Sequence, residues 1–329
     1  MYHQLTEAER YTLSVLKRDG RSLRNIAQAL QRNPSTISRE IRRNATVAAH
    51  RPNPLYVPSK AQEHANGRRR RSRQVKHHPP TVYERIEQIL AQEQWSPEQI
   101  ANQLLERDGI KISHMTIYRH VRWNQRKGGL LFRELRQGGK RRRKRTFGPE
   151  YRGKLGGKPM IDTRPAAIEL RQEIGHWEGD TVMGTSGERA CLLTLVERST
   201  GFAVVMKLPH RTVLAVNRAA TTVIQSSGLP FKTITWDNGT EFHGYRALED
   251  AAGVTCYFAF PHHPWERGSN ENFNGLLRQY FPKRRSLAKV RQADCDLVAA
   301  KLNNRPRKRH GFQTPAQRLE QSGVLHLVC

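Results

Sequence analysis

Two stretches in the first half of the chain repeat apolar residues with the spacing of paired amphipathic helices. In the first stretch, Ser22 is a helix cap, and Leu23, Ile26, Ala27 and Leu30 share one face of the helix that follows. After a polar break, Asn33 is a second cap and Pro34 suits the first helical position, so another helix should run to about Arg43. An upstream helix over residues 7–19, with apolar Tyr11, Val15 and Leu16, would complete a three-helix core.

The two faces of the helix after Pro34 differ in chemistry. Ile37 and Ile41 should point into the core. The opposite face carries a polar and basic set that suits a major groove and its phosphates: Ser35, Arg39, Arg42 and Arg43. The pattern predicts a helix-turn-helix DNA-binding domain over residues 1–50.

The same pattern recurs over residues 81–135. Ser96 and Pro97 should start a helix that buries Ile100, Ala101, Leu104 and Leu105 and ends at Gly109. Ser113 should cap a second helix, with Ile117 and Val121 inward and Met115, Arg119 and Arg122 outward. An ordinary helical hairpin has this pattern too, but two such units in tandem favour a pair of helix-turn-helix domains that bind DNA.

From His176 onward the pattern changes to short β-rich runs. Strands are expected over residues 176–184, 190–199 and 201–208, joined by turns at Thr185-Ser186-Gly187 and Thr200-Gly201. A helix (213–227), a strand (232–236), a helix (245–252), a strand (255–260) and a later helix from about Glu266 should follow. This order predicts an α/β ribonuclease H-like domain with a mixed five-stranded sheet, over residues 171–285.

Charge then identifies the kind of partner. The 329 residues include 57 Lys and Arg against 29 Asp and Glu, a net charge of +28, most of it within residues 1–150. Such an excess indicates a polyanion, here double-stranded DNA. Basic runs at residues 68–73 and 140–145 predict linkers over 51–80 and 136–170, which are either solvated spacers or arms that contact DNA phosphates. The total charge favours phosphate contact.

The rest of the chain adds three expectations. Residues 286–329 should form a helical extension, with a helix from Ser286 to about Asn303 that places Leu287, Val290 and Leu297 in the core or in an assembly. The four cysteines lie far apart without a Cys-x-x-Cys pair, so free thiols are expected rather than a zinc site. No run approaches the ~20 apolar residues of a membrane span, and we expect a cytoplasmic, nucleoid-associated protein.

Three carboxylates stand out against the predicted sheet. Asp180 lies inside the first strand, Asp237 ends the fourth, and Glu271 lies in the later helix. If the first and fourth strands are neighbours, the two aspartates lie side by side and the helix can add Glu271. Hard Mg²⁺ takes oxygen ligands, and a pair of ions about 3.5–4 Å apart needs few carboxylates besides substrate phosphate. The pattern predicts a metal-dependent phosphoryl-transfer site.

Several alternatives stay open at this point. An Asp before Asn-Gly is also common in turns, and Glu271 alone would suit a solvated helix, whereas Asp180 within a strand needs a partner or a metal. Competing carboxylates are Glu178, Glu188, Glu241 and Glu266. Side chains that would orient substrate or metal-bound water are Asn238, His262, His263, Arg267 and Asn274, with both histidines equally suited to an exposed loop. Trp177, Trp236 and Trp265 are expected in the core or lining the site, with stacking on DNA bases as the alternative.

Four segments resemble the insertion-sequence thirty family of bacterial transposases. They are Gly-His-Trp-Glu-Gly-Asp (175–180), Trp-Asp-Asn-Gly-Thr-Glu-Phe (236–242), Pro-Trp-Glu-Arg-Gly-Ser-Asn-Glu-Asn-Phe-Asn-Gly (264–275) and Leu-Asn-Asn-Arg-Pro-Arg-Lys-Arg (302–309). The 33 residues between Asp237 and Glu271 also match. The helix-turn-helix pair is similar as well, so the resemblance covers nearly the whole chain.

The resemblance implies a DDE transposase with a ribonuclease H-like, integrase-type catalytic core. Such a protein would bind terminal inverted repeats as a homodimer or larger synaptic complex and, with Mg²⁺ or Mn²⁺, cleave DNA and transfer strands into target DNA. Asp180, Asp237 and Glu271 match the family's catalytic metal ligands. Two other classes remain: a non-catalytic helix-turn-helix regulator, which leaves Asp180 unexplained, and a structure-selective nuclease of the same fold, which has less need of two DNA-reading domains.

Overall fold

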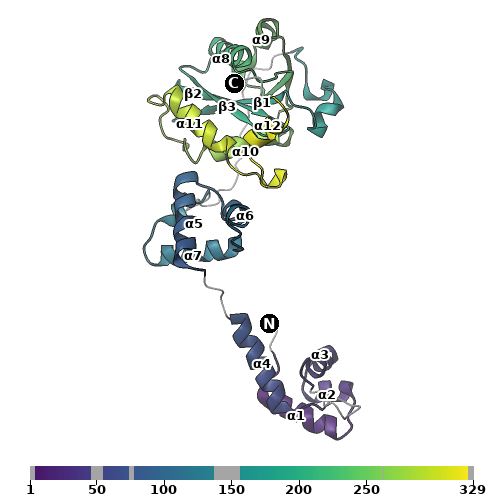
Figure 1. The fold of residues 1–329 in the computed structure, drawn as a ribbon. Helices are drawn as coiled ribbons and strands as arrows, with labels where there is room; N and C mark the ends of the chain where they lie inside the picture. Colours follow the sequence, from purple (N-terminus) through teal and green to yellow (C-terminus); the bar gives the residue numbers. More distant parts are fainter. Residues whose placement is uncertain (1–3, 46–54, 74–77, 137–155, 262, 325–329) are drawn as a thin grey trace. The chain divides into compact units, whose positions relative to one another are not determined.

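The computed structural model describes residues 4–45, 55–73, 78–136, 156–261 and 263–324 (Figure 1). The chain divides into two compact units, residues 1–79 and residues 80–329. The basic run at residues 140–145 and Cys329 lie outside the described residues, whereas Cys191, Cys256 and Cys295 are buried free thiols. Within the described residues, no helix has the length and apolar character needed to cross a membrane.

The first unit is helical and has a small apolar core. It contains α1 (Glu7–Arg18), α2 (Leu23–Ala29), α3 (Pro34–Asn44) and α4 (Pro58–Arg73). As predicted, the Ser22 and Asn33 side chains cap α2 and α3. The core consists of Leu5, Leu13, Ile26, Ala27, Ile37, Tyr56 and Ala61, with Leu16, Leu30 and Ile41 packed against it. Tyr11 and Val15 were expected in this core but are exposed, because Leu13 takes the inward position of α1.

Helix α4 corrects the expectation that residues 51–80 form a linker. Ala61 and Ala65, one helical turn apart, are buried, and α4 packs against α1 and α3. The buried Arg10 of α1 connects these helices, since it pairs with Glu40 of α3 at 2.7 Å and donates to Gln62 of α4 at 2.6 Å. The first of the two arginine runs is therefore part of a packed helix.

The second unit begins with the other predicted helix-turn-helix domain. Its helices are α5 (Pro80–Glu93), α6 (Pro97–Asp108) and α7 (His114–Arg126), followed by the short 3-10 helix η1 (Leu131–Glu134). Ser96 and Ser113 cap α6 and α7, and Gly109 ends α6 in the left-handed conformation at φ 65°. Ile100, Leu104, Ile117 and Val121 are buried as predicted. Leu105, like Leu23 of α2, was expected to be buried but is exposed, because it lies at the edge of the apolar stripe.

A mixed five-stranded sheet forms the centre of the second unit, as predicted. Its strands are β1 (His176–Met183), β2 (Cys191–Glu197), β3 (Ala203–Leu208), β4 (Thr233–Trp236) and β5 (Thr255–Phe258). Their order is β3-β2-β1-β4-β5. Strand β1 runs antiparallel to β2 and parallel to β4, with Glu178 opposite Thr235. The first and fourth strands are neighbours, which is the condition under which Asp180 and Asp237 were expected to lie side by side.

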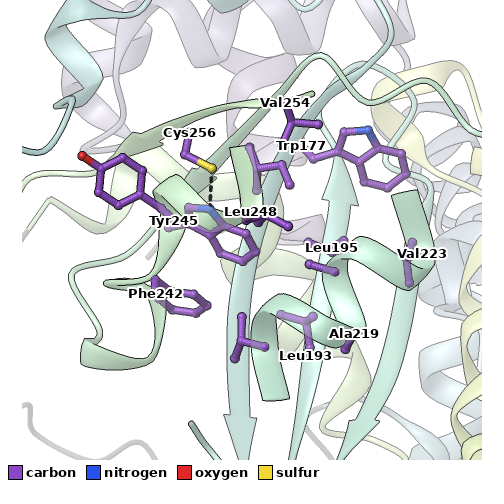
Figure 2. Packing of buried hydrophobic residues seen from close by; sticks show 14 of the residues in the cluster. Trp177, Leu193, Leu195, Ala219, Val223, Phe242, Tyr245, Leu248, Val254 and Cys256 are labelled. Atoms are coloured by element: carbon purple, nitrogen blue, oxygen red, sulfur yellow. Dashed lines mark hydrogen bonds between the residues drawn. The ribbon is translucent and has the colours of Figure 1, made fainter. Parts of the chain in front are cut away.

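Helices cover both faces of this sheet (Figure 1). Helices α8 (Val213–Ser226) and α9 (Tyr245–Ala252) pack on one face, over a cluster that includes Trp177, Leu193, Leu195 and Trp236 (Figure 2). Helices α10 (Gly268–Leu277) and α11 (Gln292–Asn303) pack on the other face, against Val182, Leu192 and Val205. Leu192 and Leu193 point to opposite faces because side chains alternate along a strand. Both faces of the sheet are therefore covered, and every residue of β2 is buried.

Both flanks of the predicted core domain belong to this fold, which corrects two expectations. Upstream, the 3-10 helices η2 (Ile161–Thr163) and η3 (Ala166–Leu170) lie within the expected linker over 136–170, yet Ile168 is buried. Downstream, α11 begins at Gln292 rather than at Ser286, and Asn303 exchanges two 2.9 Å hydrogen bonds with the backbone of Ala203 in β3. Leu287 is buried, but Leu297 is 61% exposed. The remaining elements are η6 (Lys308–His310) and α12 (Pro315–Gln321).

Gly179 of β1 gives a direct test of this packing. A Cβ at this position would lie 2.1 Å from the ring of Trp236, which stacks on Phe242 at 4.5 Å and donates to Cys256 Sγ at 3.3 Å. Because the ring is held on both sides, Gly179→Ala should lower the free energy of unfolding by about 1–3 kcal/mol, measured by urea denaturation. Gly268→Ala is the control, since nothing lies within 4 Å of its added Cβ. Equal stability of the two variants would contradict this account.

Candidate active site and DNA-binding surfaces

The two predicted aspartates meet at one edge of the β1–β4 pair. Asp180 lies on β1, two residues beyond the Glu178–Thr235 pair, and Asp237 directly follows β4. Both carboxylates face the guanidinium of Arg267: Nη1 lies 3.9 Å from Asp180 Oδ1 and Nη2 lies 3.7 Å from Asp237 Oδ2. Arg267 also donates to the carbonyl of Gly179 at 3.0 Å. A single cationic side chain thus lies between the two acids.

Helix α10 is tied to β1 by two asparagines one turn apart. Asn270 Nδ2 donates to the Glu178 carbonyl at 2.9 Å, and Asn274 Nδ2 donates to Asp180 Oδ2 at 2.8 Å. The hydroxyl of Thr194 in β2 donates to Asn274 Oδ1 at 3.2 Å, which fixes the orientation of the amide. Asn274, expected to orient substrate or water, therefore orients the Asp180 carboxylate. The same contacts position Glu271 beside β1.

A cavity of about 390 Å³ opens between β1 and α10. Its lining includes Asp180 and Glu271 together with basic and polar neighbours: Thr181, Val182, Arg267, Asn274, Gly275, Arg278 and Lys283. Asp237 reaches this group through Arg267. Among the described residues, no three His, Cys, Asp or Glu side chains are gathered closely enough to hold a metal. The described residues bring the three expected acids together in two pairs rather than in one cluster: Asp180 and Asp237 face Arg267, and Asp180 and Glu271 line one cavity. Clustered carboxylates repel one another, and a guanidinium lies between the two aspartates.

The electrostatics of Asp180 suit a cation. Burial and, to a smaller extent, the negative charge of Asp237 raise the pKa of Asp180 to about 6, although the positive charge of Arg267 opposes this shift. A carboxylate in such surroundings is stabilised in its charged form by added positive charge. Carboxylate oxygens are also the donors that hard divalent cations prefer. The acids of this edge therefore fit a divalent metal in chemical type.

The competing carboxylates are engaged elsewhere. Glu178 is fully buried, pairs with Arg198 at 3.1 Å and accepts from the backbone of Asn270 at 2.9 Å. Glu241 binds both ends of the Arg211 guanidinium, at 2.6 and 2.8 Å. Glu188 and Glu266 accept hydrogen bonds from loop residues, namely Thr185, Ser286, Leu287, Phe260 and His263. Each of these four carboxylates thus has a structural partner, whereas the described residues give the Glu271 side chain no hydrogen bond or ion pair, and it lines the cavity instead.

The other side chains that were expected near the aspartates differ in where they lie. Asn238 lies beside the site, where it donates to the Ala259 carbonyl at 2.6 Å and accepts from Lys158. Lys158 was not found from the sequence, because it lies 80 residues from its partner. Burial lowers the pKa of Lys158 and Asp237 opposes that shift. Trp177 and Trp236 are buried, but Trp265 is 68% exposed and stacks on His263, so its expected core or lining position was wrong. His262 lies outside the described residues.

The six predicted DNA-contacting side chains are exposed on their helices. Ser35, Arg39, Arg42 and Arg43 lie on α3, opposite the buried Ile37. Arg119 and Arg122 lie on α7, opposite the buried Ile117 and Val121. Arg39 and Arg43 also line a groove of about 380 Å³ with Arg68 and Arg69 of α4. The arginine run and the predicted recognition helix thus contribute to one basic surface in the first unit.

Three family descriptions match successive parts of the chain. They are a helix-turn-helix domain over residues 1–44, a homeodomain-like domain over residues 59–121 and an integrase core domain over residues 171–264. The catalytic core domain of BIV integrase, a solved structure, is similar over 46% of this chain and 97% of its own, at 22% identity and a TM-score of 0.36. The three family descriptions and the mixed five-stranded sheet define a DNA-binding protein with an integrase-type, ribonuclease H-like catalytic core.

Curated relatives match almost the whole chain. The transposase for insertion sequence element IS4351 of Bacteroides fragilis is 34% identical over 98% of this chain and 97% of its own. The IS1086 transposase of Cupriavidus metallidurans is 36% identical, over 97% and 95%, and transposase InsI for IS30C of Escherichia coli is 36% identical, over 98% and 84%. The chain belongs to the IS30 family of transposases, enzymes that cleave and join DNA with a divalent metal. The family predicted from the sequence motifs is confirmed.

Proposed function

We propose that this transposase binds the terminal inverted repeats of an insertion sequence, cuts the DNA at those ends and transfers the ends into target DNA. Asp180, Asp237 and Glu271 are its catalytic metal ligands in this proposal. The observation that carries it is the meeting of Asp180 and Asp237 around one guanidinium, with Glu271 on the cavity that Asp180 lines. The competing carboxylates Glu178, Glu188, Glu241 and Glu266 do not line this cavity, and each is bound by an arginine or by loop residues, which favours these three acids for the reaction.

The side chains around the cavity have separable tasks in this proposal. A pair of Mg²⁺ or Mn²⁺ ions would activate the attacking water or 3′-hydroxyl and stabilise the leaving oxygen. Asn274 and the Thr181 amide hold the Asp180 carboxylate in place, and the Gly239 amide holds that of Asp237. Arg278 and Lys283 add positive charge to the cavity where a DNA phosphate would enter. In-line phosphoryl transfer needs no Ser or Tyr nucleophile.

A single assay tests the proposal against its two rivals. The full-length protein is incubated with a labelled duplex carrying one end of its insertion sequence, an unlabelled target duplex and Mg²⁺, and the products are separated under denaturing conditions. We expect cleaved and joined products in Mg²⁺ or Mn²⁺, and neither product in EDTA. Binding without cleavage would support the regulator, and cleavage without joining would support the nuclease.

Assembly is part of the same proposal. Two ends must be held together before they are joined, so the active species should be a homodimer or larger synaptic complex, formed on DNA in the bacterial cytoplasm. Light scattering of the protein with and without end DNA would measure the state directly. A complex with one protein chain for each joined pair of ends would contradict this part of the proposal.

Arg39→Ala tests the DNA-reading role of α3. Because Arg39 is exposed on the helix, its loss should weaken binding of end DNA and reduce the slope of log K against log salt by about 0.9 for one lost phosphate contact. Fluorescence anisotropy at several salt concentrations measures both effects. The matched control is Arg18→Ala, which removes the same charge from the exposed end of α1. The role of Arg39 is disproved if the two variants bind alike.

A further inference from the structure

A second pocket lies on the other flank of α10 from Glu271. It has a volume of about 340 Å³ and is lined on the helix by Gly268, Ser269, Asn272, Phe273 and Leu276, whereas Arg267, Glu271, Asn274 and Gly275 line the active-site cavity. Six basic side chains face this second pocket: Arg136, Arg171, Arg305, Arg307, Lys308 and Arg309. Its described lining includes no carboxylate. We call these six residues and their cavity the arginine pocket.

The basic groups of the arginine pocket are crowded rather than neutralised. Burial, together with the positive charges of the neighbouring Arg305 and Arg309, lowers the pKa of Arg307 to about 9. Burial likewise lowers the pKa of Arg305 to about 10. Their hydrogen bonds go to uncharged oxygens, from Arg305 to Gln279 at 2.8 Å and from Arg307 to the Leu302 carbonyl at 3.0 Å. Of the six, Lys308 has a carboxylate partner, Glu98 at 2.6 Å. Such like charges are costly unless an anion joins them.

An unpaired hydroxyl points to the same kind of ligand. Ser269 is 7% exposed and its Oγ has no hydrogen-bond partner among the described residues, although it lines the pocket. A buried hydroxyl without a partner costs about 1–3 kcal/mol, which an acceptor oxygen in the pocket would offset. Gly268 and Ser269 are also the first residues of α10, whose N-terminal end carries partial positive charge. Guanidinium groups, a hydroxyl donor and a helix N-terminus are together the donors that bind phosphate.

We propose that the arginine pocket binds the phosphodiester backbone of DNA and thereby holds a strand against α10, the helix that also carries Glu271. This inference rests on the proposed function, since the strand would be the one that reaches the active-site cavity. A free phosphate ion carries too little charge to neutralise the five arginines, which form no salt bridge within the described residues, whereas duplex DNA supplies about one charge per 1.7 Å of its axis. The pocket would therefore contact more than one phosphate of a continuous strand.

Arg171→Gln in the full chain tests this proposal. Arg171 is partly exposed, so its replacement should leave the fold intact. With a fluorescein-labelled duplex, we expect roughly tenfold weaker binding and a salt slope lower by about 0.9, because one charge-assisted phosphate contact is lost. Arg171→Lys should restore part of the affinity. Arg218→Gln is the matched control, since Arg218 is exposed on α8, on the opposite face of the sheet. Equal binding by the Arg171 and Arg218 variants would overturn the proposal.

Ser269→Ala is a second variant that changes no charge. We expect it to weaken duplex binding while its melting temperature stays the same or rises, because an unpaired buried hydroxyl is removed. Unchanged binding with a lower melting temperature would show a structural hydroxyl and overturn the proposal. Each protein is also melted in inorganic phosphate and in chloride at equal ionic strength. Phosphate stabilisation that Arg171→Gln abolishes, without any change in DNA binding, would assign a free phosphate instead of DNA.

These measurements separate the arginine pocket from the proposed function. Duplex binding is read at equilibrium without a metal, so it does not depend on cleavage or joining. A protein that binds through Arg171 but never joins ends would overturn the transposase mechanism and leave the pocket in place. If the parent protein joins ends but the Arg171→Gln variant binds DNA normally, the arginine pocket would be overturned and the transposase mechanism would stand.

Discussion

Asp237→Asn should reduce strand cleavage and joining at least about a thousandfold while leaving DNA binding and thermal stability close to those of the parent protein. The amide keeps the shape of the side chain and keeps Oδ1 as the acceptor for the Gly239 amide, which donates to it at 2.8 Å. What is lost is one negative charge at the place where Asp180 and Asp237 face a shared cation. Product yields in Mg²⁺ from single-turnover reactions measure the effect.

The matched control for this variant is Asp250→Asn. Asp250 is exposed on α9, so the same change of charge there should leave cleavage and joining unaffected. Anisotropy with end DNA and a melting curve for both variants show whether binding and folding are retained. An Asp237→Asn protein that still joins ends would mean that the reacting phosphate is handled by other groups, and the assignment of all three acids would have to be withdrawn.

Much of the fold followed from local patterns. Short β-rich runs bounded by turn residues gave the five strands to within a few residues, since β-branched and apolar residues suit the strands of a buried sheet. Caps such as Ser22 and Ser113, and Pro34 at a first helical position, located the helices because they satisfy amide groups at a helix end. The adjacency of β1 and β4 was only a condition of the predicted site, and the structure supplies it.

The errors arose where charge hid a packed surface. The run at residues 68–73 suggested a linker, but Ala61 and Ala65 give α4 a small apolar stripe that packs against α1. At the other end of the chain, Cys295, Val298 and Leu302 form the inward face of α11, and of the two places expected for Leu297, the core or an assembly, its exposure excludes the core. The inward face of α4 consists of two small alanines, and that of α11 has few apolar side chains. The helical periodicity of apolar residues is therefore weak in both segments.

The types of residue that form the site could be predicted from the sequence, but the contacts between them could not. Asp180, Asp237 and Glu271 stood out because strands and motifs frame them. The position of Arg267 between the aspartates could not be foreseen, because it depends on how the 3-10 helix η5 (Pro264–Arg267) turns into α10. The arginine pocket is equally non-local, since it joins Arg171, the start of α10 and residues 305–309. The positions of these side chains depend on tertiary contacts between distant segments, which a periodic pattern in the sequence does not indicate.

Glu178 lies two residues from Asp180 on the same face of β1, and its removal should cost stability rather than chemistry. Glu178 is 0% exposed, and its partner Arg198, at 3.1 Å, is 2% exposed. Glu178→Ala would leave the buried guanidinium with Glu169, a carboxylate at 2.9 Å that is itself 58% exposed. The variant would also leave the Asn270 amide without its acceptor. Loss of one member of a buried pair costs about 3–5 kcal/mol, which urea denaturation would measure.

Two comparisons decide whether this pair is structural. Glu98→Ala removes a partly exposed carboxylate that pairs with the exposed Lys308, and such a surface pair contributes at most about 1 kcal/mol. Adding Arg198→Met to Glu178→Ala should recover part of the lost stability, because the uncompensated buried charge is then removed as well. If Glu178 were instead a metal ligand, Glu178→Ala would keep its stability and lose metal-dependent cleavage. That pattern would transfer the role assigned to Glu271, or part of it, to an acid on β1.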